Sequence, residues 1–143
     1  ALLENVLDED LRLEFRSLGS NGPNNTGHGL LIEEGPGTWL RFEFVTINQR
    51  THLFVAGFRS GQPVVQDTLA LPTAIHNSNL DLWMRVIRVD DTWTQEWSLD
   101  GETFTVGHSF DFSILVRRMG PAVAHSGEHA SPFRARWTLG TLA

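Results

Sequence analysis

The chain has 143 residues, 41% hydrophobic and 20% charged, so it is long enough to bury one core and fold as a single domain. Its formal net charge of −6 argues against a nucleic-acid partner, and no apolar run approaches the ~20 residues of a membrane span. The absence of cysteine excludes disulfides and thiolate metal sites. The chain starts at Ala1 without a signal peptide, and we expect residues 1–143 to be one domain excised from a larger protein.

Short runs with a period of two follow one another along the chain. In an early run, Leu11, Leu13 and Phe15 alternate with charged side chains. No ten-residue window shows the 3.6-residue period of an amphipathic helix. The sequence predicts strands over residues 9–17, 28–34, 38–47, 51–58, 63–69, 80–89, 92–99, 102–110 and 116–124, with a last strand near 133–139.

Turn residues separate these runs. The segment GSNGPNNTG (19–27) and the tripeptide GPG (35–37) break any regular element, and Asp100-Gly101 is a strong hairpin signal. Strands of this length, each with one apolar face, bury those faces by packing two sheets together. We therefore predict an all-β fold, a two-sheet antiparallel β-sandwich of the jelly-roll type.

The run 80–89 has an unusual outward face. Leu82 and Met84 fall on one side of this strand, which we assign to the core, and Trp83 and Arg85 fall on the other. A tryptophan and an arginine side by side on a solvent-facing strand are uncommon. This face is therefore a candidate floor for a shallow groove.

Three stretches carry a family resemblance: LWMRVIRVDDTWTQEWSLDGETFT (82–105), TGHGLLIEEGPGTWLRFEF (26–44) and MGPAVAHSGEHASPFRARW (119–137). They resemble bacterial concanavalin A-like lectin/glucanase domains (laminin G-like jelly rolls), across most of residues 10–139. The resemblance implies a module attached to a glycoside hydrolase or to a long extracellular bacterial protein. Family members usually begin with an acidic strand, where this chain has only ALLENVLD; either that strand is missing, or this N-terminus fills its place differently.

Two motifs with catalytic associations are weak here. HSGEH (125–129) has the H-x-x-E-H pattern of inverted zinc peptidases, but Gly127 interrupts it and the predicted location is a loop rather than a helix. Glu96, Asp100 and Glu102 imitate the carboxylate array of glycosidases of this fold, but the turn at Asp100-Gly101 places the two glutamates on different strands. We expect no enzyme activity.

The aromatic and arginine side chains suit sugar binding better. An indole can stack on the C–H face of a sugar ring, and guanidinium groups donate to hydroxyls. Trp83 is the expected stacking residue, with Trp93 and Trp97 in or near the core. Arg85 and Arg41, taken as neighbouring outward positions, would bind hydroxyls, and the loop residues Asn25, Asn77 and His125 would close the rim.

Calcium is a candidate cofactor, because many lectins of the resembled family hold Ca²⁺ through Asp and Asn side chains on loops. The loops of this chain carry more amides than acids, and no D-x-D-x-D-G array exists, so no metal ligand is assigned.

The resulting hypothesis is a non-catalytic carbohydrate-binding module of a larger extracellular bacterial protein. Its partners would be a poly- or oligosaccharide and the neighbouring domains of the parent chain. Two alternatives stay open. The first is a structural or adhesive spacer with no sugar ligand, in which protein covers Trp83. The second is a glycoside hydrolase of the same fold, in which two carboxylates face each other in a cleft.

Overall fold

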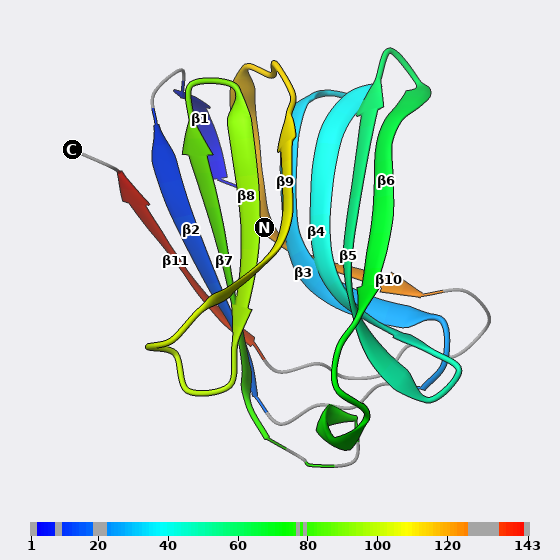
Figure 1. Cartoon of the computed structure of the whole chain (residues 1–143). Coiled ribbons are helices and arrows are strands. Elements are labelled where there is room, and N and C mark those ends of the chain that lie inside the picture. The colour runs from blue at the N-terminus through cyan, green and yellow to red at the C-terminus, as the bar shows by residue number, and fades with distance from the viewer. Residues whose placement is uncertain are drawn as a thin grey trace.

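Two antiparallel sheets make up the fold in the computed structural model, which describes residues 3–7, 10–18, 23–76, 78, 80–125 and 135–141 (Figure 1). The six-stranded sheet has the order β1-β10-β3-β4-β5-β6, and the five-stranded sheet has the order β11-β2-β7-β8-β9. The strands are β1 (Leu3–Leu7), β2 (Leu11–Ser17), β3 (Thr26–Gly35), β4 (Thr38–Ile47), β5 (Arg50–Arg59), β6 (Gln62–Ala70), β7 (Leu82–Val89), β8 (Thr92–Ser98), β9 (Thr105–Asp111), β10 (Val116–His125) and β11 (Ala135–Thr141). The predicted fold class, an antiparallel β-sandwich, is confirmed.

Each strand predicted from the two-residue period is present within a few residues of its expected ends. The additional strand is β1, which pairs antiparallel with β10 at the edge of the six-stranded sheet. The N-terminal residues therefore supply an edge strand of their own. One short 3-10 helix, Thr73–Ile75, is the helical element in the described part of the chain, where no helix is long and apolar enough to span a membrane.

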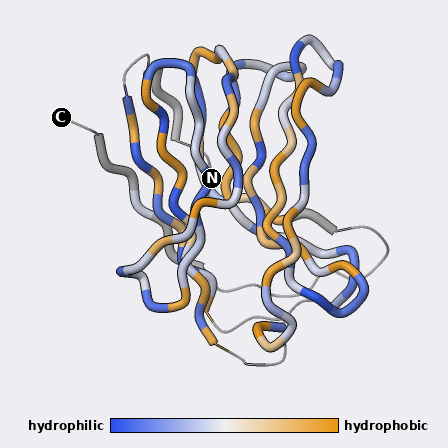
Figure 2. The backbone as a smooth tube through the Cα atoms, viewed as in Figure 1, coloured by the Kyte–Doolittle hydropathy of each residue, from blue (hydrophilic) through white to orange (hydrophobic). Residues whose placement is uncertain are grey.

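The core lies between the two sheets, and the alternation of hydropathy along the strands is visible in Figure 2. The five-stranded sheet buries Leu11, Leu13, Phe15, Leu82, Met84, Val86 and Trp93, and the six-stranded sheet buries Leu30, Ile32, Leu40, Phe42, Phe44, Leu53 and Val55. Trp93 is fully buried and donates its indole N–H to the Phe112 carbonyl at 2.9 Å. Trp97 packs against the core from a half-buried position, so the placement predicted for these two tryptophans is confirmed.

Strands β3, β4 and β5 bend along their length, and their lower ends in Figure 1 turn away from the five-stranded sheet. Two glycines in β3 allow a close approach to β4. A Cβ on Gly29 would lie 1.9 Å from the Phe42 carbonyl oxygen, and one on Gly27 would lie 2.6 Å from a Val45 methyl carbon. Because these positions tolerate no side chain, the outer face of the sheet has no bulk over the first half of β3.

The edge strands β6 and β9 lie on the same side of the sandwich, and each pairs with a single strand. β6 closes the six-stranded sheet and is exposed at eight of its nine residues. β9 closes the five-stranded sheet. His108 of β9 reaches toward Asp67 of β6, with Nε2 3.7 Å from the carboxylate, and connects the two layers at this side.

Candidate functional site

Trp83 and Arg85 lie on the outer face of the five-stranded sheet, as their parity predicted. Leu82 and Met84 are buried and Trp83 is half-buried. The guanidinium carbon of Arg16 lies 4.7 Å from the centre of the indole, and Gly101 approaches so closely that a Cβ there would lie 2.9 Å from indole atoms. Neighbouring protein groups therefore occupy part of the surface on which a sugar would stack.

The turn over Trp83 is firmly built. Gly101 has a φ of +77°, and Asp100 Oδ1 accepts hydrogen bonds from the amides of Glu102 and Thr103, each at 2.8 Å. These amides lower the pKa of Asp100 to about 2. The hairpin signal Asp100-Gly101 is thus confirmed, and the carboxylate holds the turn together.

Arg85 is engaged with its own sheet. Its Nε lies 2.7 Å from Glu96 Oε1, and its guanidinium stacks over Phe104 at 3.9 Å. Arg41 lies on β4, in the other sheet, so the prediction that Arg85 and Arg41 are outward neighbours is wrong. Parity along a strand fixes which side faces the core, but it does not say to which sheet the strand belongs.

The predicted rim residues are only partly described. Asn25 is exposed and has a φ of +65°, and its backbone N–H donates to the Thr46 carbonyl at 2.8 Å. His125 is the last residue of β10, and its backbone pairs with Thr26, so these two positions lie at the same end of the sheet. Asn77 and the rest of HSGEH after His125 lie outside the described residues.

A pocket of about 300 Å³ opens on the outer face of the six-stranded sheet. The strand register explains its position. Trp39 lies between Glu33 and Phe58 on the neighbouring strands, whereas the next outward row places Arg41 between Leu31 and Ala56. The lining consists of Leu31, Glu33, Pro36, Trp39, Arg41, Ala122 and Val123.

Aromatic and charged groups brace this pocket. The rings of Trp39 and Phe58 are stacked, with centroids 4.4 Å apart and planes inclined by 13°. At the opposite side of the same row, the Arg118 guanidinium pairs with the Glu33 carboxylate. The pocket thus combines an ordered indole with polar groups, which is the composition typical of small-ligand sites.

Arg41 and Glu43 form a charged pair in the sheet surface beside the pocket. Arg41 Nε lies 2.9 Å from Glu43 Oε1, and the Glu43 side chain is 1% exposed. Burial raises the pKa of Glu43 from 4.5 to about 7, because the opposing effect of the Arg41 charge is smaller. Neither Arg41 Nε nor Glu43 Oε2 has a hydrogen bond of good geometry, so the contact is ionic and leaves buried polar atoms unsatisfied.

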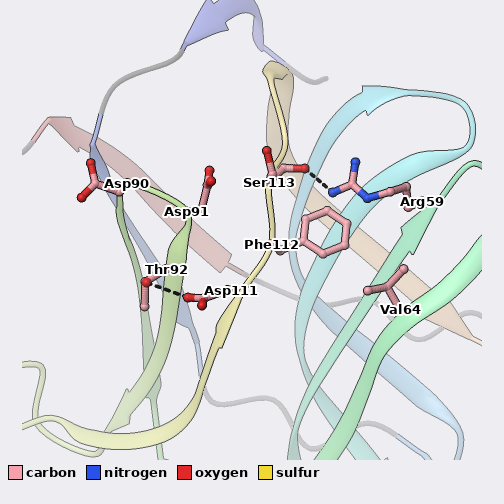
Figure 3. Close-up of a pocket in the computed structure, with 8 residues that line it drawn as sticks. All are labelled: Arg59, Val64, Asp90, Asp91, Thr92, Asp111, Phe112 and Ser113. Atoms are coloured by element: carbon pink, nitrogen blue, oxygen red, sulfur yellow. Dashed lines mark hydrogen bonds between the residues drawn. The ribbon is translucent and has the colours of Figure 1, made fainter.

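A second, more open pocket of about 520 Å³ lies at the end of the sandwich where β7 turns into β8 (Figure 3). Several of its polar groups already have partners: Thr92 donates to Asp111 at 2.7 Å, and Arg59 donates to the Ser113 carbonyl. Asp90 and Asp91 also line it and add negative charge. Among the described residues, no group of three or more His, Asp or Glu side chains is placed to hold a metal ion.

Comparison with known protein-family models found no match, and comparison with curated proteins found none. Solved structures do match in fold. A functionally unknown protein from Saccharomyces cerevisiae has a TM-score of 0.73 at 17% identity, over 99% of this chain and 74% of that chain. The exoplasmic/lumenal domain of VIP36, in its Ca²⁺/Man3GlcNAc-bound form, has a TM-score of 0.64 at 11% identity, over 98% of this chain and 71% of that chain.

Larger enzymes contain the same fold as one part. The xyloglucan PUL protein GH43B of Bacteroides ovatus matches with a TM-score of 0.70 at 9% identity, and xylan β-1,4-xylosidase of Bacillus halodurans with a TM-score of 0.67 at 11% identity. This chain is covered to 95% and 91%, but it spans only 28% and 27% of those two chains. At these identities the TM-scores show similarity of fold alone, to a β-sandwich that is also found in a lectin-like domain and in glycoside hydrolases.

The pocket was not predicted from the sequence, although its signal was present. Trp39, Arg41 and Glu43 alternate along β4, so all three share one outward parity. On the neighbouring strand β3, the outward position opposite Glu43 is a glycine, Gly29, and the missing side chain also indicates space on this face. The sequence could not show that an outward glutamate would be buried.

Proposed function

We propose that this chain is a non-catalytic carbohydrate-binding module of a larger extracellular protein, of the concanavalin A-like group, and that the sugar occupies the pocket beside Trp39 and Arg41. The observation that carries the proposal is the unsatisfied Arg41–Glu43 pair next to an ordered indole. Sugar hydroxyls accept hydrogen bonds from guanidinium groups, so they can use the outward donors of Arg41 that its contact with the buried Glu43 leaves free. The indole supplies the apolar surface for the ring.

Binding is favoured over hydrolysis by the positions of the carboxylates. Glu33 lies opposite Trp39 and Glu43 lies opposite Gly29, so the two glutamates are four residues apart in the register. At ~3.3 Å per residue this is about 13 Å along the strands, against ~5 Å between the carboxyl groups of a retaining pair and ~6.5–9.5 Å for an inverting pair.

The test compares two tryptophans on opposite sheets. Wild type, Trp39→Ala and Trp83→Ala are screened on glycan arrays, and hits are measured by calorimetry. We expect dissociation constants in the range of ~10 µM to ~1 mM for wild type, because a shallow site desolvates little surface. Trp39→Ala should weaken binding at least about tenfold, and Trp83→Ala should leave it unchanged.

The binding results of the two variants and of wild type decide whether the pocket beside Trp39 is the sugar site. Loss of binding in Trp83→Ala alone would move the site to the five-stranded sheet and refute the pocket. Retention of no glycan by wild type would refute carbohydrate binding and leave the spacer function. Thermal unfolding of both variants serves as the control, since Trp39→Ala also removes the partner of Phe58.

A further inference from the structure

The Arg41 guanidinium lies between a buried acid and an open pocket. Its Nε contacts Glu43, which is 1% exposed and does not line the pocket, whereas the Arg41 side chain is 34% exposed and does line it. Glu43 therefore binds Arg41 from within the sheet surface, and a ligand would approach the same group from outside.

Aromatic rings fix the guanidinium in this position. Its central carbon lies 5.5 Å from the centre of the Trp39 ring and 5.6 Å from that of Phe54. Within the described part of the chain, the terminal nitrogens of Arg41 have no protein acceptor, and Nε has no well-directed one. A planar guanidinium with free donors is suited to a planar, bidentate acceptor.

The charge of the site depends on Glu43. Directly opposite Glu43 on the neighbouring strands are the uncharged Gly29 of β3 and Phe54 of β5. His52, at the next outward position of β5, has its Nδ1 3.0 Å from the Arg50 carbonyl. The ion pair of Glu33 on β3 and Arg118 on β10 lies four residues farther along the register. With Glu43 ionised, the two arginines and two glutamates sum to zero. With Glu43 protonated, Arg41 loses its counter-ion and the sum becomes +1.

We propose that this pocket binds a carboxylate-bearing sugar, a hexuronate, through Arg41, and that Glu43 competes with the ligand carboxylate for the same guanidinium and so makes binding dependent on protonation of Glu43. The inference rests on the proposed carbohydrate-binding function and specifies its ligand class. A hexuronate carboxylate matches the guanidinium in shape and charge, and its ring can lie on Trp39 as a neutral sugar would.

The test uses matched methyl hexosides and methyl hexuronides of gluco, galacto and manno configuration, which differ only at C6. Their affinities are measured by NMR titration at about pH 5.5 and about pH 8.5, where a carboxyl with an ordinary pKa near ~4 is ionised throughout. Because burial places the pKa of Glu43 at about 7, its protonated fraction falls from ~0.97 to ~0.03 between these conditions. We expect the bound hexuronide to lose about 30-fold in affinity, and its hexoside to change little.

Two variants separate the mechanism from a general charge effect. Glu43→Gln cannot ionise and should retain the high hexuronide affinity at about pH 8.5, with the 30-fold pH dependence reduced to about twofold or less. Glu33→Gln removes the same charge from the pocket but leaves the Arg41–Glu43 pair, so it should raise affinity at both pH values and keep the pH dependence. His52 is unchanged in all three proteins, so any pH dependence that does not come from Glu43 will persist in Glu43→Gln.

The outcomes are distinct. Binding of hexosides with no preference for hexuronides at low pH would overturn this inference and leave the proposed function intact. An unchanged pH dependence in Glu43→Gln would also overturn it. If neither sugar class binds under any condition, both the inference and the proposed function fail.

Discussion

Replacement of Glu43 by glutamine should change the pH dependence of stability in a defined direction. The pKa of Glu43 is about 7 in the folded chain against 4.5 for an ordinary glutamate, so the folded state holds the proton more tightly than the unfolded state. The stabilising contribution is therefore complete below pH 4.5 and is lost as the pH rises through about 7. Above that pH the ionised, buried carboxylate destabilises the fold.

The magnitude follows from the pKa shift. The pKa values of Glu43 in the unfolded and folded chain differ by about 2.5, and at ~1.4 kcal/mol for each pKa unit this corresponds to about 3 kcal/mol of stability. Glutamine keeps the shape of the side chain without the charge. The free energy of unfolding of Glu43→Gln minus that of wild type should thus rise by about 3 kcal/mol between about pH 4.5 and about pH 8.5.

Urea unfolding, followed by tryptophan fluorescence across this pH range, measures that difference directly. Glu102→Gln, at an exposed position in the turn after β8, makes the same change of net charge and is the matched control. A difference between Glu43→Gln and wild type that stays constant with pH would refute the reasoning, since it would mean that Glu43 is as well solvated in the folded chain as in the unfolded one.

Two further predictions concern the core and the bend of β3. His28 is buried beside Phe15, and burial lowers its pKa from 6.5 to about 4; its stabilising contribution is therefore present above pH 6.5 and is lost on acidification. Between about pH 7.5 and about pH 4.5, wild type should lose about 2–3 kcal/mol more unfolding free energy than His28→Gln, as measured by urea unfolding. An equal loss in both proteins would contradict this assignment. Gly29→Ala forces a Cβ against the β4 backbone and should destabilise the protein by about 2 kcal/mol or more, whereas Gly35→Ala, in the same strand with nothing within 4 Å, should change the melting temperature little; similar losses in both would disprove the close approach.

The strands from β2 onward were predictable because each one carries its own signal, whereas β1 was not predicted. The two-residue period and the turn residues are local, and they located the strands and the inward side of residues 82–89. The pairing of strands is not local. Nothing in the alternation around Arg41 and Arg85 says that β4 and β7 belong to different sheets, since that depends on contacts between distant segments.

The candidate site depended on a further property that the sequence does not display. Arg41 was selected correctly as an outward residue, but an outward glutamate two positions later would ordinarily be solvated. The burial of Glu43 arises from the surroundings that the fold assembles: glycine opposite it on β3 and the Arg41 and Phe54 side chains near it. The perturbed pKa is thus a property of tertiary structure.

The unpaired edge of β6 has a practical consequence for work with the isolated protein. Along its nine residues, every second peptide group faces away from β5, and no further strand lies beside them in the described part of the chain. Such an edge is a template for intermolecular β-pairing, and the exposed Val64 and Leu69 add apolar surface to it. Pro63 interrupts the row of amide donors and Asp67 places a charge at its middle, so these two residues are the built-in protection against fibrous aggregation at high concentration.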